Sequence, residues 1–215
     1  MRFELARDRL VRLPAPLPPP RAAIEAHIVR AGPLPPGARR DSDAPSRDAA
    51  ALVLLYPDSV GEARIVLMLR PAGDHVHAGQ VALPGGAREP GDSFPAGTAL
   101  REASEEVGLD AATAGVTTLG VLDTVDVRVS GYMLVPVLAV ADREPALTAD
   151  AREVAAILTV PVRHFLPDAP VETVDEDRGG WHLRYGAYPV AGHRVWGATA
   201  RVLGQLGAVL GRTDS

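Results

Sequence analysis

The sequence predicts an α/β protein in which a β-sheet is covered by helices on both faces, with further helices at the two ends of the chain. Two segments, AALVLLY and ARIVLML, are almost continuously apolar. Such strands are typical of sheets buried on both faces, whereas half-exposed sheets show alternation. The segment 95–108 has one apolar and one acidic side at helical spacing. With 215 residues, 47% of them apolar, the chain can bury a proper core.

Composition excludes several classes of protein. The net charge of −5 leaves no general excess of positive charge for nucleic acid. The absence of cysteine excludes disulfides and thiolate metal sites. All 22 basic residues are arginine, so P-loop and Schiff-base lysine chemistry are excluded as well.

The sequence predicts a cytoplasmic protein that does not bind a membrane. It has no run of 18 apolar residues, which a membrane-spanning helix requires. The N-terminal segment MRFELARDRLVRLP mixes charges of both signs and lacks the apolar stretch of a secretory signal.

The first 47 residues are predicted to be an N-terminal extension with a mobile loop. Residues 5–13 have the pattern of a short amphipathic helix, and the proline-rich residues 15–20 should run extended. A second helix is predicted over 21–30, followed by a loop over 31–47 that is rich in Gly, Pro, Ser and charge. Residues 48–215 are predicted to form one domain that includes a C-terminal helix.

The domain should begin with a hairpin formed by the two apolar segments, joined by the turn PDSVGE. A brief strand over 80–83 leads to Gly85 and Gly86. The next helix should begin near Pro95, capped by Asp92 or Ser93, and end at Gly108.

The remaining elements follow from the same patterns. Strands are predicted over 116–122 and 132–140, joined by residues 123–130. Residues 153–159 should form a short helix or turn that runs into a strand. A late hairpin is predicted over 171–174 and 180–185. Residues 193–211 have apolar side chains at helical spacing and should form the terminal helix.

Three glutamates share one side of the predicted 95–108 helix. Glu102, Glu105 and Glu106 lie apart from its apolar residues. Like charges at this spacing destabilise a helix by a few tenths of a kcal/mol per pair, so they need either solvent or a counter-ion. A solvated acidic face is the ordinary interpretation, and a bound divalent cation is the more specific one.

The residues around these glutamates favour the cation. R-E-A-S-E-E-V-G-L, from Arg101 to Leu109, matches every fixed position in the second half of the Nudix box, so the chain resembles the Nudix hydrolases. In the first half, counted from Gly86, Asp92 stands where Glu is usual, and eight residues rather than seven precede Arg101. This variant is similar to the coenzyme A pyrophosphatase branch of the family.

A second signature of that branch precedes the box. Between Leu67 and Gly86 this chain matches it at Arg70, Gly79 and the run Pro84-Gly85-Gly86. Pro71, His75 and Leu83 depart from it, by replacing a small residue, an Arg and a Phe. The segment W-G-A-T-A also resembles the C-terminal helix of this branch.

The resemblance implies a Nudix α/β/α sandwich around a mixed β-sheet and a site for Mg²⁺ or Mn²⁺. Carboxylate oxygens are natural ligands for these hard cations. The implied principal metal ligands are Glu102 and Glu106, with the main-chain carbonyl of Gly85. Glu105 is a further ligand or, as in some members, the base. Arg101 should pair with Asp92 and orient the loop. The family often recruits one more acid from a later loop. Glu153 is the candidate here, and Asp150 or a merely solvated Glu153 are the alternatives.

The second signature implies the substrate-binding residues. They are Arg70, His75, His77, Gly79 and Gln80. His75 stands where an Arg is presumed to meet substrate phosphate, and neutral imidazole is a poor substitute for guanidinium.

The implied activity is metal-dependent hydrolysis of the diphosphate bond of coenzyme A or its thioesters, giving 3′,5′-ADP and a 4′-phosphopantetheine product. Water is the expected nucleophile. Two alternatives stay open: hydrolysis of another nucleoside diphosphate derivative such as NADH or ADP-ribose, and a non-catalytic Nudix domain that senses a nucleotide. The sequence also leaves open whether the chain forms a homodimer through its terminal helices.

Overall fold

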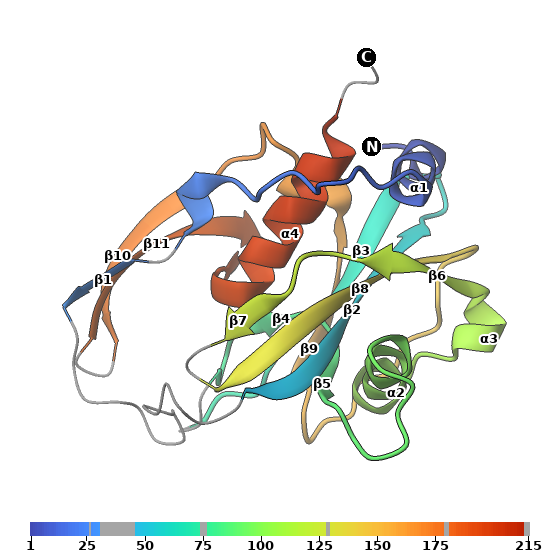
Figure 1. Ribbon diagram of the computed structural model, residues 1–215, viewed down its shortest axis with the longest axis horizontal. Helices are drawn as coiled ribbons and strands as arrows, with labels where there is room; N and C mark the ends of the chain where they lie inside the picture. Colours follow the sequence, from blue (N-terminus) through green and yellow to red (C-terminus); the bar gives the residue numbers. More distant parts are fainter. Residues whose placement is uncertain (26, 31–45, 74–76, 128–129, 179–180, 213–215) are drawn as a thin grey trace.

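The computed structural model describes residues 1–25, 27–30, 46–73, 77–127, 130–178 and 181–212. Within these residues the chain forms a mixed eight-stranded sheet with helices on both faces, and a smaller four-stranded sheet beside it (Figure 1). The elements in chain order are α1 (Phe3–Val11), the 3₁₀ helix η1 (Ala22–Ile24), β1 (His27–Arg30), β2 (Arg47–Pro57), β3 (Ala63–Leu69), β4 (Val81–Ala82), β5 (Gly85–Ala87), α2 (Ala96–Val107), α3 (Ala111–Ala114), β6 (Val116–Val121), β7 (Val125–Val127), β8 (Tyr132–Ala141), β9 (Ala156–Pro161), η2 (Val162–Phe165), β10 (Glu172–Arg178), β11 (Trp181–Val190), β12 (His193–Val195) and α4 (Gly197–Leu210).

Strand β2 is at the centre of the large sheet. It pairs in parallel with β8 and antiparallel with both β3 and β5. The main strand order is β4-β3-β2-β8-β6, with β9 added on β3 and β7 on β8. The predicted mixed sheet is therefore confirmed.

The two faces of the sheet carry separate cores. Side chains alternate along β2, so that Leu52 and Leu54 pack on one face while Val53 and Leu55 pack on the other. Helix α2 covers the first face with Ala99, Ala103 and Val107. The second face packs against α1 and α4, which Figure 1 shows on the opposite side of the sheet from α2. This arrangement confirms the α/β/α layers predicted from the unbroken apolar strands.

The smaller sheet is built on β11. Strand β10 pairs antiparallel with it along one edge, β1 along the other, and β12 near its C-terminal end. The predicted late hairpin is confirmed, although both of its strands are longer than expected.

The predicted helix over 21–30 is wrong. One turn of 3₁₀ helix, η1, is followed by strand β1, which pairs with β11. Ile28 and Val29 are β-branched and favour a strand, and β11 offers them an edge. Local periodicity could not show that edge, because β11 lies about 150 residues further along the chain.

Smaller corrections concern the ends and links of elements. The segment 123–130 contains the short strand β7, and residues 193–195 form β12, so that the terminal helix begins at Gly197. Glu153 lies in a turn that leads into β9. Helix α2 ends at Gly108 as predicted, with φ 64°, but its N-terminal residue Pro95 has no side-chain cap. The mobile loop predicted over 31–47 lies mostly outside the described residues.

No helix among the described residues is both long and apolar enough to cross a lipid bilayer.

Candidate active site

The glycine pair Gly85-Gly86 forms the floor of the candidate site. Strand β5 pairs with β2 so that Gly85 lies opposite Ala51. A Cβ on Gly85 would lie 2.4 Å from the carbonyl oxygen of Ala50, and a Cβ on Gly86 would lie 2.4 Å from Oε1 of Glu102. The first glycine therefore allows close strand pairing. The second leaves room for a carboxylate.

Helix α2 brings Glu106 directly against this floor. Its side chain is only 3% exposed. The backbone N–H of Gly85 donates to Oε2 of Glu106 at 2.8 Å, and Nη2 of Arg70 lies 3.7 Å from Oε1. Burial raises the pKa of Glu106 to about 7 against these two favourable contacts, and the charges of Glu102 and Glu153 raise it further. Glu106 is therefore an enclosed carboxylate and does not belong to a solvated acidic face, which was the ordinary interpretation of its spacing.

Glu102 lies one turn earlier on the same helix. Its side chain is 14% exposed and lies 3.0 Å from Nη2 of Arg101. Burial raises the pKa of Glu102, and the charges of Glu105 and Glu153 act in the same direction. Two enclosed carboxylates thus lie against Gly85 and Gly86 of β5 and repel each other.

Arg101 connects the acidic helix to the loop before it. Its guanidinium donates to both carboxylate oxygens of Asp92, at 3.2 and 3.1 Å, and to the carbonyl oxygen of Ala87 at 3.0 Å. The predicted pair between Arg101 and Asp92 is therefore present. Arg101 holds the pKa of Asp92 far below its ordinary value, and Thr98 also donates its hydroxyl to this carboxylate. These bonds explain why Asp92 does not cap the helix.

Glu105 is placed differently from the other two glutamates. Its side chain is 59% exposed and accepts a hydrogen bond from Nη1 of Arg101 at 2.9 Å. The three glutamates therefore consist of two enclosed carboxylates and one exposed carboxylate held by Arg101. A metal-binding role for Glu105 stays a prediction.

The loop before β9 carries the two candidates for an additional acid. The carboxylate of Asp150 is bound to Arg152 at 2.6 Å, which lowers its pKa to about 2. The backbone N–H of Asp150 donates to the carbonyl oxygen of Glu106 at 2.9 Å and fixes the loop to the end of α2. The charge of Glu153 raises the pKa of both enclosed carboxylates. These contacts favour Glu153 over Asp150.

The predicted substrate-binding residues lie on the loop between β3 and β4. The backbone N–H of Arg70 donates to the carbonyl oxygen of Gln80 at 2.9 Å. Nδ1 of His77 lies 3.1 Å from Oε1 of Gln80. Both His77 and Gly79 have positive φ, at 73° and 66°. Arg70 points at Glu106, whereas Gly79 and Gln80 line a separate pocket. His75 lies outside the described residues.

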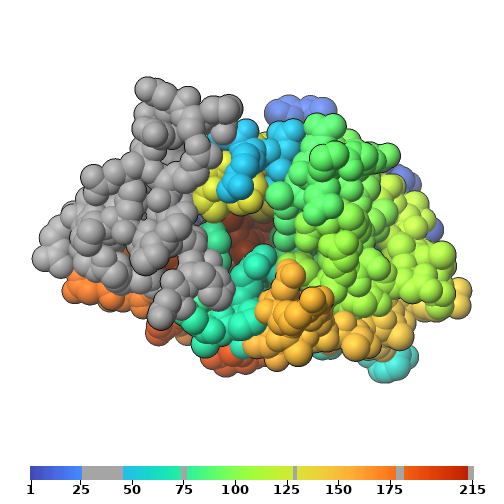
Figure 2. Space-filling model, turned by 90° about the horizontal axis from the view of Figure 1, so that it is seen from below, coloured from blue at the N-terminus to red at the C-terminus, as the bar shows by residue number. Residues whose placement is uncertain are grey.

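The donor set fits a hard divalent cation. Glu102, Glu106 and Glu153 supply only carboxylate oxygens, and a cation among them would offset the repulsion that raises two of their pKa values. In the described part of the chain, no three ligand-type side chains already surround a common point. Arg101 contacts Glu102, and Arg70 faces Glu106. Figure 2 looks onto this side of the molecule, where the surface is hollowed between the green segment that includes α2 and the teal residues before β5.

The raised pKa of Glu106 predicts that the metal-free protein loses stability as pH rises. Glu106 keeps its proton in the folded protein at pH values where the unfolded chain has lost it. The stabilisation that this proton gives to the folded protein is complete below pH 4.5 and disappears as pH passes 7. The shift corresponds to a loss on the order of 3 kcal/mol in the free energy of unfolding. Urea denaturation of the wild-type protein in EDTA, at pH 5 and at pH 7.5, measures this loss in the free energy of unfolding. The same pH dependence in Glu106→Gln would contradict this assignment.

The structure brings to this region some residues that no sequence motif indicates. Thr98 is fully buried and bonds to Asp92. Tyr185 and Trp196 stack on each other beside Gln80, with ring centroids 4.6 Å apart. The available signal was the rarity of aromatic residues, which make up 4% of the chain. Tyr185 and Trp196 come together through the smaller sheet, and the spacing of residues along the chain does not reveal that sheet.

Comparison with known proteins identifies the domain that contains the candidate metal-binding residues Glu102, Glu106 and Glu153. A family model described as NUDIX domain matches residues 45–177, more than half of the chain. A curated relative from Photorhabdus laumondii, named Uncharacterized Nudix hydrolase NudL, is 35% identical over 173 residues, which cover 80% of this chain and 89% of that protein. Nudix hydrolase 22, chloroplastic, from Arabidopsis thaliana is 32% identical and covers 73% of this chain and 53% of its own.

Solved structures give weaker similarity. The crystal structure of a Nudix hydrolase from M. smegmatis, RenU, has 27% sequence identity and a TM-score of 0.47, and the match covers 56% of this chain and 74% of that chain.

Proposed function

Since this chain belongs to the Nudix hydrolase family, we propose that it hydrolyses the diphosphate bond of coenzyme A or acyl-coenzyme A with Mg²⁺ or Mn²⁺, giving 3′,5′-ADP and a 4′-phosphopantetheine product. The observation that carries the proposal is the pair of enclosed carboxylates, Glu102 and Glu106, which lie against Gly85 and Gly86 of β5 with Arg70 near Glu106. The coenzyme A assignment is supported by the motif matches at Arg70, Gly79 and Pro84-Gly85-Gly86.

Each side chain has a separate part in this proposal. The cation would be held by Glu102 and Glu106, together with Glu105 and with Glu153 from the neighbouring turn. A bound divalent cation neutralises charge on the diphosphate oxygens and lowers the pKa of water. The N–H of Gly85 orients Glu106, and Arg101 positions Glu102 while joining it to the loop at Asp92. The guanidinium of Arg70 lies 3.7 Å from Glu106 and has further N–H groups that can bind a non-bridging oxygen of the diphosphate.

A parallel substrate panel tests the coenzyme A assignment. Coenzyme A, dephospho-coenzyme A, NADH and ADP-ribose should be incubated under identical conditions with Mg²⁺ or Mn²⁺. We expect kcat/KM for coenzyme A to exceed that for NADH and ADP-ribose by at least about tenfold, which corresponds to 1.4 kcal/mol in transition-state binding. Chromatography should identify 3′,5′-ADP as a product.

Two outcomes would overturn parts of the proposal. Preferred hydrolysis of NADH or ADP-ribose would keep the catalytic site and replace the substrate. Equilibrium binding of these nucleotides without turnover in saturating Mn²⁺ would favour a non-catalytic sensor.

A further inference from the structure

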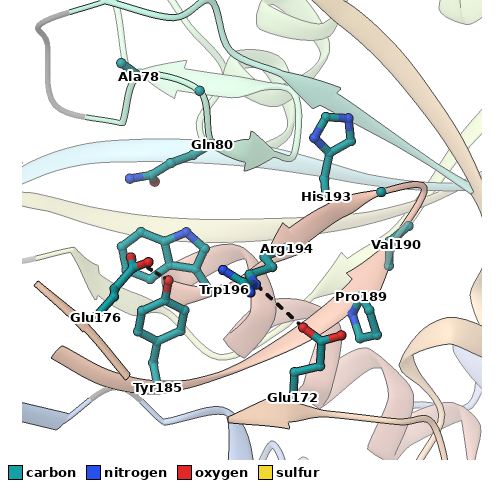
Figure 3. Close-up of a pocket in the computed structure, with 12 residues that line it drawn as sticks. Ala78, Gln80, Glu172, Glu176, Tyr185, Pro189, Val190, His193, Arg194 and Trp196 are labelled. Carbon is teal, nitrogen blue, oxygen red and sulfur yellow. Dashed lines mark hydrogen bonds and ion pairs between the residues drawn. The ribbon is translucent and has the colours of Figure 1, made fainter. Parts of the chain in front are cut away.

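A pocket of about 520 Å³ lies beside the candidate active site, between the loop that ends at Gln80 and the smaller sheet (Figure 3). Its volume is in the range of pockets that bind small molecules. Gln80 lines one side, and Tyr185, Trp196 and Arg194 line the other. None of the metal-binding candidates lines it, so the pocket is distinct from the candidate metal site.

An aromatic surface forms part of the pocket wall. The rings of Tyr185 and Trp196 stack with an interplanar angle of 26°. Tyr185 is 2% exposed and supports one face of the indole, while Trp196 is only half-buried. Figure 3 shows Gln80 extending from its loop toward this ring pair. A rigid indole that is backed by a second ring is well suited to stack on a flat ligand.

The charges of the pocket disfavour phosphate. Two carboxylates, Glu172 and Glu176, line it together with the guanidinium of Arg194 and the imidazole of His193. Arg194 is already paired with Glu172 at 3.6 Å, and the hydroxyl of Tyr185 donates to Glu176 at 2.8 Å. Each carboxylate has further lone pairs that can accept from an amino group. The pocket therefore suits an uncharged aromatic ring that carries a hydrogen-bond donor.

The pocket and the acidic site are within reach of one substrate. Strand β12, which supplies Arg194, packs against β4. Gly85 follows Gln80 by five positions in the chain, and five extended residues span at most about 18 Å. Arg70 marks the phosphate end of this path, because it faces Glu106.

We propose that this pocket binds the aminopurine base of the nucleotide substrate by stacking it on Trp196 while the diphosphate lies at Glu102 and Glu106. The inference rests on the proposed function, because it assigns the base of the proposed substrate to this pocket. It also makes Trp196 a specificity residue. An adenine ring is planar and uncharged, and its amino group can donate to Glu172 or Glu176.

Calorimetric binding in EDTA tests the pocket without catalysis. AMP should bind the wild-type protein at least about tenfold more tightly than ribose 5-phosphate, which has the same phosphate and sugar but no base. Trp196→Leu should weaken AMP binding about tenfold, since stacking contributes about 1–3 kcal/mol per base. Trp196→Phe, which keeps a ring, should stay within about threefold of wild type. Ribose 5-phosphate should bind all three proteins equally.

Two results would overturn the pocket assignment. One is equal affinity of the wild-type protein for AMP and ribose 5-phosphate, which needs no variant. The other is unchanged AMP affinity in Trp196→Leu whose circular dichroism shows a native fold. Turnover of coenzyme A, measured in parallel, separates the two proposals. Loss of AMP binding in Trp196→Leu would support the pocket even if the wild-type protein hydrolysed no diphosphate.

Discussion

Substituting glutamine for Glu106 is expected to lower kcat by about 10²- to 10⁴-fold in saturating Mg²⁺ while the protein stays folded. Glu106 is the most enclosed acid of the site, held by the N–H of Gly85 and facing Arg70. Glutamine has nearly the same shape, and its carbonyl oxygen can still accept from Gly85. The substitution therefore removes a negative charge and a cation ligand but leaves the packing in place.

Steady-state kinetics measure the expected loss in kcat, and thermal unfolding of the same preparations shows whether the protein stays folded. The matched control is Glu4→Gln, the same change at an exposed position of α1. Its kcat should equal that of wild type. Wild-type turnover by Glu106→Gln would show that the chemistry takes place elsewhere.

A methyl group on Gly86 is expected to lower kcat/KM by about 10²-fold with little change in stability. The new Cβ would lie 2.4 Å from Oε1 and 2.6 Å from Cδ of Glu102, so the carboxylate has to move. A displacement of about 1 Å in a catalytic site is enough for a loss of this size. The atoms in the way belong to the end of a flexible side chain, so the backbone keeps its conformation.

Two other glycines provide the comparison. In Gly85→Ala the Cβ would meet backbone atoms of β2, at 2.4 Å from the oxygen of Ala50 and 2.5 Å from Cα of Ala51. That variant should lose about 1–3 kcal/mol or more in the free energy of unfolding. Gly97→Ala lies in α2 near Ser93, with no carboxylate among its close neighbours, and should retain activity. Full activity in Gly86→Ala would mean that the position of Glu102 does not matter.

The elements next to the site could be predicted because their signals are local. Helix α2 ends at Gly108, where φ is 64°. A residue with positive φ is most easily a glycine, so the sequence marks this end directly. The unbroken apolar segments of β2 and β3 likewise predicted burial on both faces, and the two cores on either side of the sheet confirm it.

The environment of each acid could not be predicted, because it depends on distant parts of the chain. The spacing of Glu102, Glu105 and Glu106 predicted a shared side of the helix. Burial of Glu106 and exposure of Glu105 arise from strand β5 packing across one edge of that side. The pairing of β1 with β11 joins segments about 150 residues apart, and no local pattern indicates that contact.

Mn²⁺ binding is the most direct test of whether the enclosed carboxylates hold a divalent cation. The electron paramagnetic resonance signal of free Mn²⁺ can be followed during titration of the wild-type protein and of the double variant Glu102→Gln/Glu106→Gln. The double variant should bind Mn²⁺ more than about tenfold more weakly while remaining folded. Equal Mn²⁺ affinity of the two proteins would contradict the cation site between Glu102 and Glu106.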